Sequence, residues 1–285
     1  MLTILFDGIS TGMLLFVLAC GLAVTLGLMN FVNLAHGAFA MVGGYVTVIA
    51  MQRFGVPFLA TLPLAFLIAA AIGLVLERTL YVHLYGRSHL DQVMFSIGLV
   101  FMAMAGMDWF MGSSPQNVIL PEALKGRFDF AGIGIGRYRL FLVVICGILA
   151  VALQLTLSKT RFGSRLRAAV DDQRVARGLG IRVQTIFAAT FAVGSGLAGL
   201  GGALGAEILG LDPSFPVKYM VFFLIVVTVG GTSSIVGPFL AALMLGIADV
   251  GSKYYVPELG SFVIYAVMIA VLIVRPNGLF ARPGR

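Results

Sequence analysis

Long stretches without a charged residue decide what this chain can fold into. Seven of them, free of Asp, Glu, Lys and Arg, cover residues 8–52, 54–76, 92–107, 140–158, 183–206, 219–248 and 259–274. A helix needs roughly 20 apolar residues to cross the hydrocarbon core of a bilayer, so these runs predict membrane spans. Strands of membrane β-barrels alternate polar and apolar residues, and these runs do not. We therefore expect an all-α integral membrane protein.

The composition supports this interpretation and excludes several kinds of site. The chain is 60% hydrophobic and 11% charged, whereas soluble domains average about 25% charged residues. Its 36 glycines suit close helix packing in lipid. The two cysteines lie in apolar runs and cannot build a disulfide framework or a metal cluster, so we expect no cofactor. The net charge of +7 is explained by membrane topology, and we expect lipid contacts and no nucleic acid.

Two of the runs are too long for one crossing. A helix over 8–52 would extend about 68 Å against a core of roughly 30 Å, so the chain must break and fold back. Polar and glycine-rich interruptions occur near 30–37 and 230–238. Non-helical backbone at membrane depth persists only where it is buried in protein or lines a water-filled path. We expect one domain over 1–285, with eight to ten helical segments interrupted at these two places.

The residues at the two interruptions are candidates for the translocation path or for the helix break itself. They are Asn30, Asn33, His36, Gly37, Gly230, Gly231, Ser233 and Gly237. A structural turn near one interface would explain either interruption equally well. For His36, three roles stay open: a hydrogen bond that ties the break together, lining of the path, or ligand and proton transfer.

Basic residues orient the chain across the membrane. Seven of the 19 Lys and Arg lie in 158–184, three in the tail 275–285 and two in 77–91. Cytoplasmic loops collect Lys and Arg, so these three segments should be cytoplasmic and the C-terminus with them. The loops 112–138 and 210–218 then face outside, and we favour an outside N-terminus.

The basic loop 158–184 also has a helical pattern. A carboxylate at 171 or 172 can cap a short helix from about 173, and a glycine at 178 or 180 can end it in the left-handed region. The result would be two short helices whose apolar faces carry Leu166, Val170, Ala176 and Leu179. Such a loop is either a solvated positive loop or a docking element for a partner, and composition does not separate the two.

Four motifs occur in a specific order along the chain. They are residues 21–27 followed by 30–39 and 43–45; the loop residues Gly163, Arg167, Ala168, Asp172, Ala176, Gly180 and Ile181; residues 229–238; and residues 275–280. In these motifs the sequence resembles the permease subunits of high-affinity branched-chain amino acid ABC importers. At 232–234, Thr-Ser-Ser replaces a glycine of the family pattern.

The resemblance implies one membrane subunit of a heteromeric importer in the bacterial inner membrane. Its partners would be a second permease subunit or a second copy, two cytoplasmic ATPases that bind the coupling loop, and a periplasmic solute-binding protein. The solute would be a branched-chain or related amino acid, with urea and short amides as the alternative. The chain has no phosphate-binding loop of the G-x-x-x-x-G-K-[ST] type, so it is not the ATPase.

A gradient-driven transporter or channel is the competing class. It would predict paired carboxylates in the middle of the membrane, and the centres of the runs contain none. Two carboxylates, Glu207 and Asp249, each end a long run and are candidates for lining a solute path. A position at the end of a helix explains both without a function.

Overall fold

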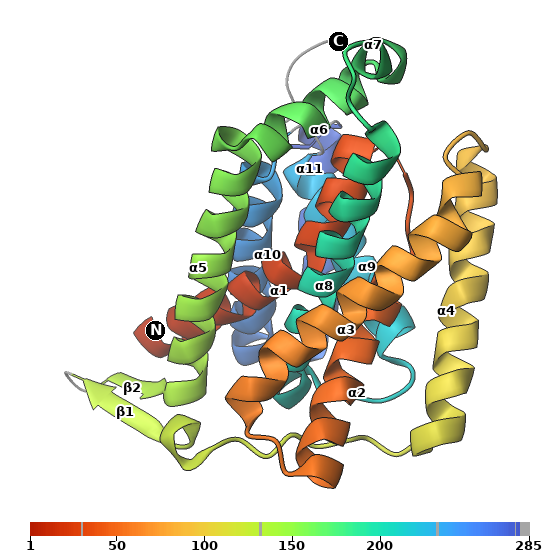
Figure 1. Cartoon of the computed structure of the whole chain (residues 1–285). Coiled ribbons are helices and arrows are strands. Elements are labelled where there is room, and N and C mark those ends of the chain that lie inside the picture. Colours follow the sequence, from red (N-terminus) through yellow and green to blue (C-terminus); the bar gives the residue numbers. More distant parts are fainter. Residues whose placement is uncertain (30, 131–132, 232–233, 277, 280–285) are drawn as a thin grey trace.

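The computed structural model is almost entirely helical (Figure 1) and describes the chain except for residues 30, 131–132, 232–233, 277 and 280–285. Its long helices are α1 (Leu2–Met29), α2 (His36–Phe54), α3 (Phe58–Thr79), α4 (His89–Met111), α5 (Arg137–Lys159), α8 (Val183–Leu209), α9 (Phe215–Gly230), α10 (Val236–Tyr255) and α11 (Gly260–Val274). The shorter elements are η1 (Tyr81–His83), η2 (Glu122–Leu124), α6 (Arg161–Asp171), α7 (Gln173–Gly178), η3 (Pro257–Leu259) and the hairpin β1 (Arg127–Phe130) with β2 (Ile133–Gly136). The predicted all-α membrane fold is confirmed.

Within the described part of the chain, six helices are long and apolar enough to cross a membrane: α1, α3, α4, α5, α8 and α10. Two shorter apolar helices, α9 and the segment Phe262–Val274 of α11, add to them. The 19-residue α2 is not among the six, although it packs inside the bundle. The exact number of crossings stays a prediction.

The centre of the bundle is α8, which packs on α1, α2 and α3 (Figure 1). Glycine makes these contacts possible, because a Cβ on Gly202 would overlap the backbone of Ala40 and a Cβ on Gly43 would overlap that of Gly199. Small residues let helix backbones touch in lipid, where dispersion rather than hydrophobicity holds helices together. The close helix packing that the glycine content indicated is therefore found at the contacts of α8.

The helices α4 and α5 lie at the periphery of the bundle (Figure 1). Only 11% of the most apolar window of each is buried. Their exposed large apolar side chains are Leu90, Met94, Phe101, Met102, Trp109 and Phe110 on α4, and Leu140, Val144, Ile148, Val151 and Leu155 on α5. Surfaces this apolar need lipid or another membrane subunit to cover them.

Both predicted interruptions are present. The helix α1 ends at Met29 and α2 begins at His36, and α1 packs mainly on α10 and α8 while α2 packs on α8 and α3. The second interruption separates α9 from α10. There the chain after α11 folds back, because Leu279 N–H donates to the carbonyl of Val229 at 2.8 Å. The tail motif and the second glycine-rich motif are thus in direct contact.

Candidate functional site

The first interruption is held by the side chain of Asn33, which is buried. Its Oδ1 accepts hydrogen bonds from Ala35 N–H at 3.1 Å and from the Tyr81 hydroxyl at 3.0 Å. The first bond closes the turn before α2, and the second ties the turn to η1. Of the other residues predicted here, Asn30 lies outside the described residues.

Helix α4 supplies partners that the sequence analysis missed. Val32 N–H donates to Gln92 Oε1 and Leu34 N–H donates to Ser96 Oγ, each at 3.2 Å. Gln92 and Ser96 are four residues apart, so they share one face of the helix. This polar pair within the apolar run 92–107 is the signal that could have revealed them. Together they satisfy backbone groups that would be costly to leave unpaired in a membrane.

His36 joins the start of α2 to α1. The ring is 2% exposed, and its Nε2 lies 2.7 Å from the carbonyl oxygen of Leu18. The ring also covers Gly21 of α1, where a Cβ would come within 2.6 Å of His36 Cε1. Next to it, Gly37 packs on the backbone of Pro216 in α9. Both residues therefore sit at helix contacts, which supports the structural interpretation of this break.

The second interruption is a close reversal between α9 and α10. A Cβ on Gly230 would stand 2.5 Å from the carbonyl carbon of Gly237, and Gly231 has a φ of 82°. Only glycine adopts this conformation without strain. Gly278 of the tail packs on Gly231, because a Cβ on Gly278 would come within 2.7 Å of the Cα of Gly231. The predicted Ser233 lies outside the described residues.

The loop 158–184 forms the two helices that the sequence predicts. Thr160 Oγ1 caps α6 by accepting from Gly163 N–H at 3.3 Å. Asp172 Oδ1 caps α7 by accepting from Arg174 N–H at 2.8 Å and Val175 N–H at 3.0 Å. After α7, Gly180 turns the chain with a φ of 80°. The predicted cap at 172 and glycine turn at 180 are confirmed.

The two short helices enclose a small apolar core of their own. It consists of Leu166, Ala169, Ala176, Val183 and Phe187. Among the residues expected to form the coupling loop, Gly163 and Ala176 are buried, Ala168 and Ile181 are half-buried, and Arg167, Asp172 and Gly180 are exposed. Two apolar side chains of this region point outward: Val175 is 57% exposed and Leu179 is 74% exposed.

The loop core connects to the first interruption through aromatic rings. Tyr85 packs edge-on against Phe187 of α8 and against Phe31, with ring centroids 5.5 Å and 5.6 Å apart. Its hydroxyl donates to Glu77 Oε1 at 2.9 Å. Burial, and then the Glu77 carboxylate, raises the pKa of the Tyr85 hydroxyl, so it remains a donor. Phe31 continues the contact to Tyr81, whose ring centroid is 5.3 Å away.

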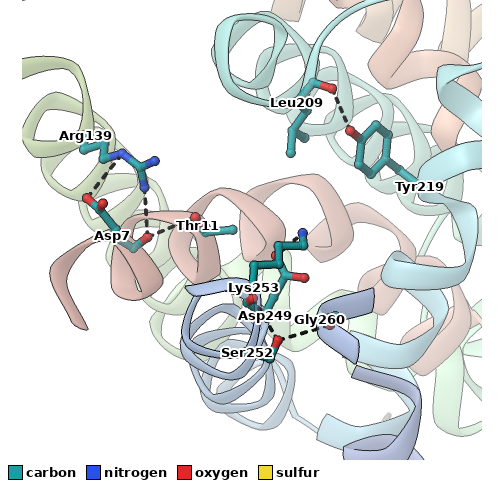
Figure 2. A network of polar contacts seen from close by, with 9 residues as sticks. All are labelled: Asp7, Thr11, Arg139, Leu209, Tyr219, Asp249, Ser252, Lys253 and Gly260. Carbon is teal, nitrogen blue, oxygen red and sulfur yellow. Dashed lines mark hydrogen bonds and ion pairs between the residues drawn. The ribbon is translucent and has the colours of Figure 1, made fainter. Parts of the chain in front are cut away.

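The two candidate path carboxylates lie in different surroundings. Asp249 is buried at 6% exposure, pairs with Lys253 at 2.7 Å and lines a cavity of about 430 Å³. Glu207 is exposed and lines a neighbouring cavity of about 470 Å³. Arg139 lines both cavities and pairs with Asp7, with 3.2 Å between Nε and Oδ1 (Figure 2). Among the described residues, no group of three or more His, Cys, Asp and Glu could hold a metal ion.

A sequence model of the family described as "Branched-chain amino acid transport system / permease component" matches residues 4–272. The chain belongs to this family. Its members are transport components and not enzymes, and this permease is a multi-pass protein of the inner membrane.

Individual relatives of this permease cover nearly its whole length. The permease protein BraD of a high-affinity branched-chain amino acid transport system from Pseudomonas aeruginosa is 28% identical, over 98% of this chain and 95% of the relative. LivH of Escherichia coli is 27% identical over the same shares. LivM of Escherichia coli is 26% identical, over 94% of this chain and 68% of the relative. No solved structure matches the chain.

Proposed function

We propose that this permease forms part of the solute path of an ATP-driven importer for a branched-chain or related amino acid. The names of relatives that align with nearly the whole chain, which are branched-chain amino acid permeases, support this substrate class. Urea and short amides are the alternative substrates, because the same architecture would carry them. In this proposal a periplasmic binding protein delivers the solute, and two cytoplasmic ATPases supply the energy.

The permease works in a pair, with a second permease subunit or a second copy of itself. Its similarity to both LivH and LivM, two permease proteins of one organism, supports such pairing. The apolar faces of α4 and α5 offer surfaces for lipid and for this partner. We propose a single domain over 1–285, in which a main buried core joins the long helices and the loop 158–184 adds the small core of its own.

The observation that carries the proposal is the pair Val175 and Leu179, which we call the docking pair. Both side chains are largely exposed, yet they project from a loop whose own core is closed around Ala176. Exposed apolar side chains that charged residues surround are typical of protein contact sites. Arg174 and Arg177 flank them and are exposed. Buried residues such as Ala176 then hold the platform in shape rather than touch the ATPase.

The docking pair lies at the cytoplasmic end in this proposal. The helices α6 and α7 and the α3–α4 connection lie at one end of the bundle, and the β1–β2 hairpin lies at the other (Figure 1). Of the chain's Lys and Arg, seven lie in 158–184 and two in 77–91. Because cytoplasmic loops collect basic residues, this end faces the cytoplasm, and we place the C-terminus there as well.

Docking can act on the solute path through the aromatic contacts. A displacement of α6 and α7 moves Phe187, which packs on Tyr85, and Tyr85 packs on Phe31 in the first interruption. The interruption is the place where helical hydrogen bonds are already replaced by side-chain bonds. A change of conformation there breaks few backbone bonds, so we assign the conformational change to this segment.

The test is Leu179→Ala in the complex assembled from permease, ATPases and binding protein. Full burial of a leucine contributes about 1.5–3 kcal/mol, and Leu179 is 74% exposed before docking. Losing most of this gain weakens ATPase docking by about 5–30-fold. The measurement is solute-stimulated ATP hydrolysis as the ATPase is titrated onto the permease in lipid nanodiscs.

The matched control is Leu67→Ala. Leu67 is 62% exposed in the middle of α3 and should leave the titration unchanged. An unchanged titration for the double substitution Val175→Ala with Leu179→Ala would overturn the docking proposal. Solute uptake that persists without ATP would refute the proposal that the transporter is driven by ATP.

A further inference from the structure

The cavity beside Asp249 lies between α1, α8, α9 and α10. Its volume of about 430 Å³ falls within the range of small-molecule pockets, which is about 300–1,000 Å³. Residues Leu15, Ile208 and Phe222 line one part of it, and Tyr219, Asp249 and Arg139 add polar groups. The ends of α8 and α10 that form the cavity lie at the end of the bundle opposite α6 and α7 (Figure 1). This is the side on which a solute would be delivered.

Asp249 lines this cavity, and one of its carboxylate oxygens has no partner among the described residues. Asp249 Oδ2 accepts from Lys253 Nζ at 2.7 Å, whereas Oδ1 is buried and has no hydrogen bond within the described part of the chain. The ion pair with Lys253 needs only one oxygen, so it does not explain the other. A buried acceptor left unpaired is unfavourable because its lost hydration is not replaced. The unpaired oxygen therefore points to a donor that arrives with a ligand.

A cation that lines the same cavity has donor capacity left. Arg139 uses Nε for Asp7 Oδ1 at 3.2 Å and Nη1 for the Asp7 carbonyl at 3.3 Å (Figure 2). Both contacts hold the guanidinium in place on one side. Its remaining Nη2 has no hydrogen bond among those found in the described residues. Each of the two ion pairs has no net charge, so the cavity suits a neutral zwitterion better than an ion.

We infer that this cavity binds an α-amino acid with an apolar side chain. The Oδ1 of Asp249 accepts from the ammonium group, Arg139 Nη2 donates to the carboxylate, and the apolar wall around Leu15 and Phe222 receives the side chain. The inference rests on the proposed function, because it takes an amino acid as the solute. It adds a binding site within the permease itself, on the side opposite the docking pair.

The experiment measures binding of radiolabelled leucine to the full chain in phospholipid nanodiscs by scintillation proximity. Unlabelled leucine and leucinamide, which both carry the ammonium, should compete, and 4-methylpentanoate, which lacks it, should not. The substitution Asp249→Asn should weaken leucine binding about tenfold or more, because it removes a charge-assisted hydrogen bond. The matched control is Glu122→Gln, which alters an exposed carboxylate that also pairs with a lysine, Lys125, at 2.6 Å.

A second variant separates binding from folding. Lys253→Gln breaks the same ion pair as Asp249→Asn but keeps the carboxylate, so it should bind leucine within about threefold of the unmodified chain. Equal losses in both variants would show that the ion pair merely supports the fold and would overturn the inference. Wild-type binding by Asp249→Asn, or no leucine binding up to about 10 mM, would overturn it as well.

The same assay separates this inference from the proposed function. Binding of radiolabelled urea or acetamide, with no binding of radiolabelled leucine, would refute the amino acid as solute and the inference with it. If Asp249→Asn binds leucine like the unmodified chain while Leu179→Ala still weakens ATPase docking, the binding site alone is refuted. The docking titration compares chains that all keep Asp249, so the two results are independent.

Discussion

The hydrogen bond between Tyr81 and Asn33 gives a quantitative test of the first interruption. Both side chains are almost fully buried, at 0% and 1% exposure. The Oδ1 of Asn33 accepts from the Tyr81 hydroxyl and from Ala35 N–H, at 3.0 Å and 3.1 Å. Replacing Asn33 with leucine keeps the approximate size of the side chain but removes the acceptor for both donors.

The two substitutions should lower stability by different amounts, and the effect of Tyr81→Phe should change sign once Asn33 is replaced. Asn33→Leu leaves two buried donors unpaired, and each is unfavourable by about 1–3 kcal/mol, so the loss is about 2–6 kcal/mol. Tyr81→Phe alone removes one donor and leaves the Ala35 bond intact, for a loss of about 0.5–1.5 kcal/mol. In the Asn33→Leu background, however, Tyr81→Phe removes an unpaired hydroxyl. It should therefore stabilise that protein, so the two substitutions are not additive.

The cysteines provide the assay. Cys20 and Cys146 are free and buried, so a maleimide dye reacts with them only as the bundle opens on heating. The midpoint of thermal unfolding in nanodiscs is compared for the two single variants and the double variant. We expect the double variant to be more stable than Asn33→Leu. A double variant that is less stable than Asn33→Leu would refute the role assigned to this hydrogen bond.

Three further outcomes follow from other contacts. His36→Gln should retain more leucine uptake than His36→Ala, because only glutamine can still donate to the Leu18 carbonyl; loss of uptake in both at normal membrane levels would favour proton transfer. Gly180→Pro should abolish solute-stimulated ATP hydrolysis in the assembled complex, because proline cannot adopt a φ of 80°. Gly202→Ala should lower stability by about 1–3 kcal/mol, measured as a lower unfolding midpoint, whereas Gly106→Ala, with open space around it, should not.

The features that could be predicted from sequence are those set by length and local chemistry. A charge-free run of 45 residues cannot cross a bilayer once, so the interruption near 30–37 follows from arithmetic. The cap at Asp172 and the turn at Gly180 depend on residues within one helical turn. These predictions needed no knowledge of which helices are neighbours.

The partners across the fold could not be predicted in the same way. Gln92 and Ser96 pair with backbone groups about 60 positions earlier in the chain, and only the packing of α4 brings them there. The loop shows a related difference. The sequence analysis placed Ala176 and Leu179 on apolar faces, whereas the structure buries Ala176 and leaves Leu179 exposed. Helix α7 ends at Gly178, so Leu179 no longer follows the helical face.

The loop core next to the docking pair and the cavity beside Asp249 lie at opposite ends of one helix, α8. This limits how a conformational change at one of them can reach the other. Phe187 near the start of α8 belongs to the loop core, and Leu209 at its end lines the cavity beside Asp249, so roughly 33 Å of helix joins them. Glycine contacts press α8 against the backbones of α1, α2 and α3, so α8 cannot bend or move sideways without displacing them. A displacement caused by ATPase docking at the docking pair must therefore move this group of helices together. The interruption at 30–37, whose hydrogen bonds come from side chains on α4 and η1, is where that group can shift relative to α4.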